Sequence, residues 1–176
     1  VVEGARDLSW SGILDGEILA WRDGVVLPFL QLQARLGRKN PSPAIRAEIP
    51  VIYVAWDVLG LDRDADAVVT PLLERPLRER RALLEGLDLP LAAEGGRFAL
   101  SHLASVDSVE GLEAAFTEAR ARRNEGLLVK DPTSRYSPGR RGLGWLKMKK
   151  ALATIDCVVV GVEVGHGKRH GVLSDY

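Results

Sequence analysis

Apolar and polar positions follow two different periods along the chain, one of two residues and one near 3.6. Runs with the strand period or with continuous apolar character predict strands over Ile13–Trp21, Val51–Leu59, Arg97–Ser101, Gly126–Lys130, Gly144–Lys149, Thr154–Val164 and Val172–Tyr176. The second of these runs is almost wholly apolar, which is typical of a buried central strand. Asp23-Gly24 supplies the positive φ angles of a tight turn, so a hairpin is expected after the first strand.

Helical spacing of apolar residues predicts three helices. They are expected over Pro28–Leu36, Arg75–Leu87 and Ser108–Arg123. In the second helix the leucines are expected to face the core, and the Arg and Glu positions are expected to face water. The segment Asn40–Pro50 contains three prolines and is expected to be a loop. Together the elements predict an α+β fold in which antiparallel sheets are flanked by helices.

Length and composition limit the classes of protein to which the chain can belong. It has 176 residues, 46% hydrophobic and 27% charged, which suits a globular domain with part of a second one. No apolar run reaches the length of a membrane span, and the N-terminus does not resemble a signal peptide. Cys157 is the single cysteine, which excludes an internal disulfide and fits a reducing compartment. We therefore expect a cytoplasmic protein with no membrane partner.

Positive charge is concentrated in one stretch of an otherwise neutral chain. The whole sequence has 24 basic and 24 acidic residues, whereas the stretch Glu125–Lys150 contains many more basic than acidic side chains. Its basic residues are Lys130, Arg135, Arg140, Arg141, Lys147, Lys149 and Lys150. Such a cluster suits a polyphosphate or a nucleic-acid backbone. Composition alone equally allows a solvated basic loop between two strands.

Three short groups of residues suggest a nucleotide site. Asp15-Gly16-Glu17 places acids on a strand, and Trp56-Asp57 lies near the end of the buried strand. Lys147 and Lys149 are two residues apart, so on a strand they point to one face. Ammonium groups can bind phosphate oxygens, and carboxylates can bind Mg²⁺ or a ribose hydroxyl. The pattern therefore predicts a cleft for a nucleoside triphosphate and its metal ion.

Four of the motifs, in their order and spacing, resemble those of a known family. LDGEILAW, VAWDVL, EGLLVK and WLKMKK look like successive nucleotidyltransferase motifs of ATP-dependent DNA ligases of the bacterial and archaeal type. The resemblance covers nearly the whole chain. It implies part of a ligase/capping-enzyme adenylation domain (ATP-grasp-like) at residues 1–151, and the first strands of an OB-fold domain at residues 152–176. It also implies nicked double-stranded DNA, ATP and Mg²⁺ as partners, with roles in DNA replication, repair and recombination.

The resemblance also assigns nucleotide-binding roles to particular positions. Glu17 matches the carboxylate near the ribose, and Trp56 matches an aromatic residue that stacks on adenine, with Tyr53 as the alternative. Leu128 would cover the other face of the base, and Glu125 matches the metal-associated carboxylate. The lysines expected to contact the α-phosphate and to assist pyrophosphate departure, and thus to take part in catalysis, are Lys147 and Lys149.

Other basic residues are expected to contact phosphates. Arg141 matches a phosphate-contacting arginine, and Arg140 is the alternative for that role and a candidate DNA contact. Arg35, Arg38 and Lys39 cluster after a predicted helix. They are candidates for contacts with DNA, although a favourable interaction with the helix dipole would equally explain them.

One departure from the family pattern limits the expected activity. The family's nucleophile is a lysine in a Lys-x-Asp-Gly motif that precedes Asp-Gly-Glu, and no such motif occurs here; the first lysine is Lys39. The resemblance therefore implies an internal fragment of an enzyme that seals nicks through lysyl-AMP and DNA-adenylate intermediates. The fragment alone is expected to be inactive. The alternatives are an RNA ligase or capping-type nucleotidyltransferase, or a non-catalytic nucleotide- or DNA-binding module of the same fold.

Overall fold

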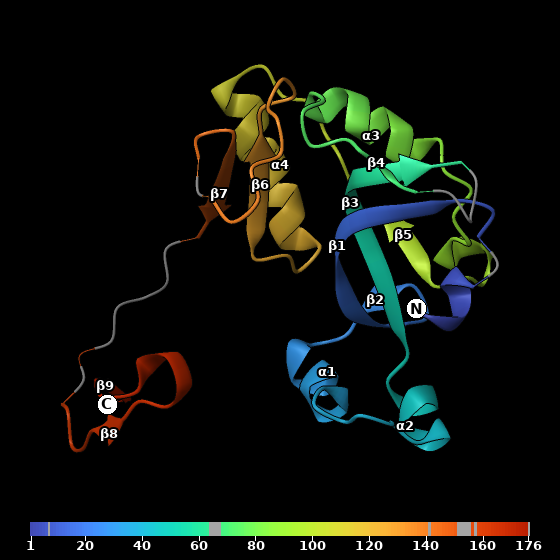
Figure 1. The fold of residues 1–176 in the computed structure, drawn as a ribbon. Coiled ribbons are helices and arrows are strands. Elements are labelled where there is room, and N and C mark those ends of the chain that lie inside the picture. The colour runs from blue at the N-terminus through green and yellow to red at the C-terminus, as the bar shows by residue number, and fades with distance from the viewer. Residues whose placement is uncertain (7, 64–67, 141, 151–155, 157, 176) are drawn as a thin grey trace.

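A five-stranded sheet forms the centre of the protein. The computed structural model describes residues 1–6, 8–63, 68–140, 142–150, 156 and 158–175. Its two long strands, β1 (Ser11–Arg22) and β3 (Val51–Asp62), pair antiparallel (Figure 1). The short strands β2 (Val25–Val26) and β4 (Thr70–Pro71) complete the order β2-β1-β3-β4, and β5 (Phe98–Leu100) pairs parallel with β3. The α+β prediction is therefore confirmed, with one parallel pair in an otherwise antiparallel sheet.

Two features of β1 follow directly from glycine. The expected tight turn after β1 is present, with φ of 50° at Asp23 and 82° at Gly24. Within β1, a Cβ atom at Gly16 would lie 2.4 Å from the Val54 carbonyl oxygen and 2.7 Å from the Tyr53 ring. Only glycine fits this close approach of β1 to β3. The register also shifts there, so that Trp56 lies between the pairs Asp15–Asp57 and Gly16–Ala55.

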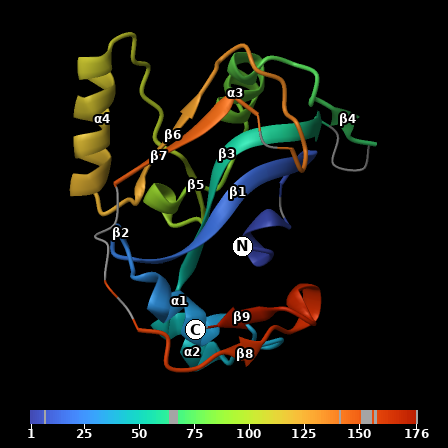
Figure 2. The same cartoon turned by 90° about the vertical axis from the view of Figure 1, so that its left-hand side faces the viewer.

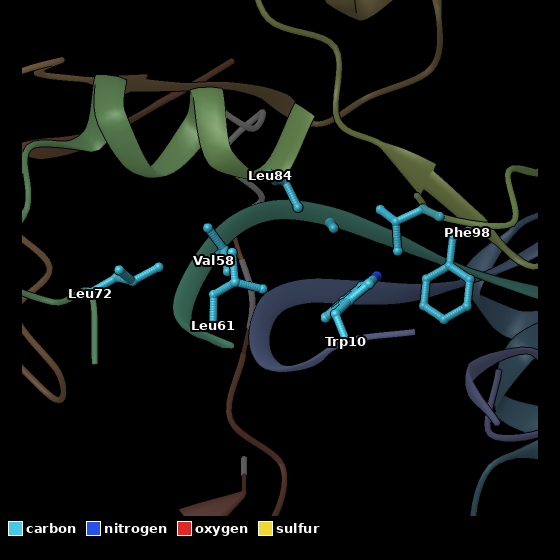
Figure 3. Packing of buried hydrophobic residues seen from close by; sticks show 8 residues of the cluster. Trp10, Val58, Leu61, Leu72, Leu84 and Phe98 are labelled. Carbon is cyan, nitrogen blue, oxygen red and sulfur yellow. The ribbon is translucent and has the colours of Figure 1, made fainter. Parts of the chain in front are cut away.

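The main hydrophobic core lies between β3 and helix α3 (Leu77–Glu85). Leu84 on the helix and Val58 on the strand are both fully buried (Figure 3). Trp10, Leu61, Leu72 and Phe98 complete the labelled part of the cluster. Burying these large apolar side chains is the main favourable contribution to the stability of the fold.

The expectation that every Arg and Glu of α3 faces water is wrong. Arg80 is fully buried, and Arg81 is 9% exposed. Arg81 donates to the Ser101 hydroxyl and carbonyl at 2.9 and 2.8 Å and pairs with Glu85 at 2.6 Å. Two arginines thus lie on the side of the helix where apolar spacing alone predicts leucine. Their charges can be buried there because each guanidinium has hydrogen-bond partners.

Two short helices lie near the start of β3. Helix α1 (Phe29–Arg35) occupies the expected position, whereas α2 (Pro43–Glu48) forms within the segment expected to be a loop. The Ser42 hydroxyl accepts a hydrogen bond from the Ile45 backbone amide at 3.3 Å. Ser42 is therefore an N-cap, and Pro43 occupies the first helical position, where a missing N–H costs nothing. The loop expected over Asn40–Pro50 is therefore wrong, because Pro43 starts a helix where it stands.

A separate hairpin contains the basic stretch. Strands β6 (Gly126–Lys130) and β7 (Trp145–Lys149) pair antiparallel as expected, and helix α4 (Val109–Ala121) lies beside β6 (Figures 1 and 2). The loop that follows β6 is bound to the start of α3. The Leu77 amide donates to the Ser134 carbonyl at 2.9 Å, and the Tyr136 amide donates to the Leu73 carbonyl at 3.0 Å. These bonds fix the hairpin relative to the core helix.

The C-terminal region contains a small hairpin of β8 (Glu163–Val164) and β9 (Leu173–Asp175). The strand expected over Thr154–Val164 is therefore much shorter, since Val158–Val162 has no strand pairing and residues 154, 155 and 157 lie outside the described part. Short 3₁₀ turns cover Glu3–Ala5, Ala92–Glu94 and Gly167–Arg169. Among the described residues, no helix has the length and apolar character needed to cross a membrane.

Candidate nucleotide-binding site

The two strands of the β6–β7 hairpin present their lysines, Lys130, Lys147 and Lys149, on one face. The register pairs Gly126 with Lys149, Leu128 with Lys147, and Lys130 with Trp145, and side chains of paired residues lie on the same face of a sheet. We call this side the cationic face; it consists of Leu128, Lys130, Trp145, Lys147 and Lys149. The side chains of Leu127, Val129 and Met148 lie on the other face, and α4 lies against β6.

Lys130 connects the cationic face with β3. Its Nζ atom lies 3.7 Å from the centroid of the Trp145 ring and 5.7 Å from that of the Trp56 ring. Burial lowers the pKa of Lys130 to about 8, although the carboxylates of Asp57 and Asp15 act in the opposite direction. Strand β3, which carries Trp56, and strand β7, which carries Lys147 and Lys149, thus approach each other at this amine.

Tyr136 holds the loop of the hairpin against β1. Its hydroxyl donates to Asp15 Oδ2 at 2.8 Å, and its ring packs edge-to-face on Trp145 with centroids 5.6 Å apart. The Arg80 guanidinium lies 5.8 Å from the centre of the same ring. Burial and the bond to Asp15 raise the pKa of Tyr136 to about 12. The hydroxyl therefore remains a donor throughout the physiological pH range.

A buried ion pair lies beneath Trp56. Arg80 Nε and Nη2 donate to Asp57 Oδ1 and Oδ2 at 2.9 and 2.8 Å, and both side chains are fully buried. The Val58 amide also donates to Asp57 Oδ1 at 2.9 Å. Arg80 Nη1 donates to the carbonyls of Arg75 and Ser134. One guanidinium thus joins β3, α3 and the loop of the hairpin next to the candidate site.

Only one member of this pair could be predicted from the sequence. A carboxylate at Asp57 within an apolar strand requires a buried partner, because an unpaired charge is rarely buried. Nothing in the spacing of the α3 arginines distinguished Arg80 from its exposed neighbour Arg78. The partner became evident only from the packing of α3 on β3.

Glu125, the predicted metal carboxylate, forms an ion pair with Lys149 Nζ at 2.6 Å. The hydrogen bond from Lys149 lowers the pKa of the Glu125 carboxyl. Among the residues that the structure describes, no group of three or more His, Cys, Asp or Glu side chains could hold a metal ion. The carboxylate of Glu125 alone fits Mg²⁺ that takes its other ligands from phosphate oxygens and water, which is the usual arrangement in nucleotide sites.

The two candidate adenine-stacking residues have different surroundings. Tyr53 packs edge-to-face on Phe98, and its hydroxyl donates to the Leu14 carbonyl at 3.0 Å, so its ring is used within the sheet. Trp56 is half-buried next to the hairpin, and its buried Nε1 has no hydrogen-bond partner among the described residues. A buried N–H without an acceptor suits a site that a polar ligand completes.

The remaining candidates of the nucleotide site lie near this group or outside the description. Glu17 is exposed on β1 and pairs in register with Val54. Leu128 is 41% exposed on the cationic face. Arg140 is exposed in the loop of the hairpin, and Arg141 lies outside the described residues.

The candidate DNA contacts of α1 lie elsewhere. Helix α1 lies near the start of β3, whereas the hairpin lies towards the other end of that strand (Figure 1). Arg35 Nη1 donates to the Ile49 carbonyl at 2.6 Å, and Arg38 Nε donates to the Ala34 carbonyl at 2.9 Å. Lys39 is exposed. These residues are therefore not part of the cationic face.

The lowered pKa of Lys130 has a consequence for stability. Its pKa is about 8 in the folded chain and about 10.5 in the unfolded chain, so the unfolded state binds more protons between these values. The free energy of unfolding should therefore rise as the pH increases above about 8. Urea unfolding at pH 8 and at about pH 9.5, below the tyrosine titrations, should show this rise in the wild type. Lys130→Met should reduce it, and an unchanged slope would contradict the burial of the amine.

Comparison with known proteins gives the family of the chain. The family model described as "ATP dependent DNA ligase domain" matches residues 3–149. A probable DNA ligase of Opitutus terrae is 50% identical over 92% of this chain and 18% of its own length. A probable DNA ligase of Koribacter versatilis is 44% identical over 93% of this chain and 31% of its own length.

Solved structures give the same result. The ligase domain of LigD from M. tuberculosis is 32% identical, with a TM-score of 0.54 over 78% of this chain and 38% of that structure. A mycobacterial DNA ligase D complexed with ATP and MES is 31% identical, with a TM-score of 0.57 over 84% of this chain and 40% of that one. The chain spans less than a third of the length of the two curated relatives from Opitutus terrae and Koribacter versatilis. Because the family model covers most of it, the chain belongs to the ATP-dependent DNA ligase domain family.

Proposed function

We propose that this chain is part of an ATP-dependent DNA ligase that seals nicks in double-stranded DNA. Residues 1–151 would be the C-terminal part of its adenylation domain, and residues 152–176 the start of an OB-fold domain. The observation that carries the proposal is the cationic face, which meets Trp56 of β3 through Lys130 in a chain of this family. A cytoplasmic location and a role in DNA replication, repair or recombination belong to the same proposal.

The nucleotide would lie between β3 and the cationic face. Trp56 would stack on the adenine, Leu128 would cover the other side of the base, and Glu17 would bind the ribose. Lys147 and Lys149 would contact the α-phosphate and stabilise the negative charge that develops as pyrophosphate leaves. Arg141 would contact phosphate oxygens, and Arg140 is the alternative for that role.

Mg²⁺ would neutralise phosphate charge in this site when bound. Glu125 would hold it, since a carboxylate with phosphate oxygens and water suits Mg²⁺. In the structure the same carboxylate binds Lys149. An ammonium that moves to a phosphate would leave Glu125 free for the metal ion, so the ion pair would be exchanged for two contacts with the nucleotide complex.

ATP binding and lysine modification can be separated in this chain. The 176 residues contain no Lys-x-Asp-Gly motif, so the attacking lysine that the resemblance implies is not among them. With α-labelled ATP and Mg²⁺, we expect reversible retention of the label on the native protein and no label after denaturation. Trp56→Leu should weaken the retention, because the stacking surface is lost.

The outcomes of this experiment separate the candidate functions. A label that survives denaturation and maps to any lysine would contradict the assigned role of this chain. No retention of ATP by the native chain would contradict the nucleotide site. Retention of ATP without any ligase activity of the complete natural protein would favour the second candidate, a non-catalytic nucleotide- or DNA-binding module.

A further inference from the structure

A hollow of about 430 Å³ lies near the start of β3, apart from the cationic face. Four arginines from different parts of the chain line it, and we call it the arginine pocket. They are Arg35 of α1, Arg38 after α1, Arg46 of α2 and Arg97 before β5. These residues lie up to 62 positions apart in the sequence, so no local motif predicts the cluster.

The charge of the arginine pocket is unbalanced. Among the described residues that line it, Glu3 is the single acid, and its Oε1 accepts from Arg46 Nη1 at 2.8 Å. Burial, followed by repulsion from Arg46 and Arg97, lowers the pKa of Arg35. Arg35 is half-buried, whereas Arg38, Arg46 and Arg97 are exposed, so the hollow is open to solvent. Guanidiniums that repel one another in such a hollow are stabilised by an anion between them.

Hydrogen bonds within the protein use only part of the donor capacity of these side chains. Arg35 and Arg38 are positioned by bonds to the carbonyls of Ile49 and Ala34. Each guanidinium has five N–H donors, so most of them remain for a ligand. The side chain of Arg97 has no hydrogen-bond partner within the described part of the chain. Planar guanidinium donors match the oxygens of a phosphate group.

The position of the pocket favours a long ligand. Val51 lines it, and Trp56 lies five residues further along β3, a span of about 17 Å at ~3.3 Å per residue. None of the described residues that line the pocket is an aromatic residue that could stack on a base. Apolar residues such as Leu32 and Ile18 do line it, and they suit the carbon atoms of a sugar. A nucleic-acid backbone provides phosphates and sugars over such a distance.

We infer that the arginine pocket binds a phosphate group of the DNA backbone, as a second anion site distinct from the nucleotide site. This inference rests on the proposed function, and it assigns Arg46 and Arg97 to DNA binding together with Arg35 and Arg38. A duplex bound there would be held about five base-pair steps from Trp56, at ~3.4 Å per step.

The test compares two double variants of the 176-residue chain. Arg46→Gln with Arg97→Gln removes two charges from the pocket, and Arg63→Gln with Arg122→Gln removes two exposed charges elsewhere. Binding of a nicked duplex is measured by fluorescence anisotropy at several salt concentrations, with inorganic tripolyphosphate as a competitor. The pocket variant should bind DNA about tenfold more weakly at low salt. Its log–log salt slope should fall by about one to two, since each lost phosphate contact removes about 0.9.

Further measurements make each outcome decisive. Arg46→Lys with Arg97→Lys keeps both charges and should retain most of the salt slope, which a folding defect would not allow. The pocket variant should retain α-labelled ATP like the wild type. A failure of the DNA-binding inference is therefore distinguishable from a failure of the proposed nucleotide site. Equal DNA binding by the pocket variant and the control would overturn the inference. Loss of tripolyphosphate competition without weaker DNA binding would also overturn it, because the pocket would then take only free anions.

Discussion

Arg80→Ala is expected to lower the free energy of unfolding by about 3–5 kcal/mol, because it leaves the Asp57 carboxylate buried without its partner. Both side chains are fully buried, and they are joined by two hydrogen bonds of 2.9 and 2.8 Å. The substitution also removes the bonds from Arg80 to the carbonyls of Arg75 and Ser134. Urea unfolding monitored by tryptophan fluorescence measures the change.

A neighbouring arginine provides the matched control. Arg78 lies on the same helix and is exposed, so Arg78→Ala should change the stability by no more than about 0.5 kcal/mol. Asp57→Ala with Arg80→Ala should cost less than the sum of the two single changes, since neither charge is then left unpaired. A loss for Arg80→Ala as small as that for Arg78→Ala would show that the buried pair is not formed.

Arg80 should also influence the site, because it connects Asp57 to the loop of the β6–β7 hairpin. Trp56 precedes Asp57, and Tyr136 of the loop contacts Trp145 of the cationic face. Loss of the guanidinium therefore releases both sides of the proposed nucleotide site together. A stability defect that is accompanied by weaker ATP retention at a temperature where the variant is still folded would support this coupling.

The elements that the sequence predicted well are those whose signal is local. Strand β3 is continuous and apolar, and the turn at Asp23-Gly24 has a backbone conformation that few other residue pairs adopt. The α2 helix was missed although its signal was also local, because Ser42-Pro43 acts as a cap and first turn rather than as a helix breaker. The positions of the prolines, and not their number, carried the information.

The candidate site was only partly predictable, because its residues come together through tertiary packing. The motifs located the hairpin and the face shared by Lys147 and Lys149. They could not show that Lys130 contacts both Trp56 and Trp145, or that Arg80 lies beneath the site. These contacts depend on how α3 and the hairpin pack on β3. The arginine pocket was beyond prediction for the same reason, since α1, α2 and the residue before β5 meet only in the fold.

Lys147→Ala with Lys149→Ala is expected to weaken ATP binding about a hundredfold. Each lysine would contribute a charged hydrogen bond to phosphate, and each such bond contributes about 1.5–3 kcal/mol. Since about 1.4 kcal/mol corresponds to a tenfold change in affinity, each lysine accounts for at least about tenfold. The two side chains lie on the exposed cationic face, so their loss should leave the stability of the fold nearly unchanged. Equilibrium retention of α-labelled ATP in the presence of Mg²⁺ measures the effect.

The comparison requires a variant that loses equal charge at a distant position. Lys168→Ala with Arg169→Ala removes two exposed cations from the turn before β9 and should bind ATP like the wild type. Lys149→Ala alone should raise the pKa of Glu125 towards its ordinary value, because the hydrogen bond that lowers it is lost. If the Lys147/Lys149 variant bound ATP as tightly as the Lys168/Arg169 variant, the cationic face would be a solvated surface, and the nucleotide would have to bind elsewhere.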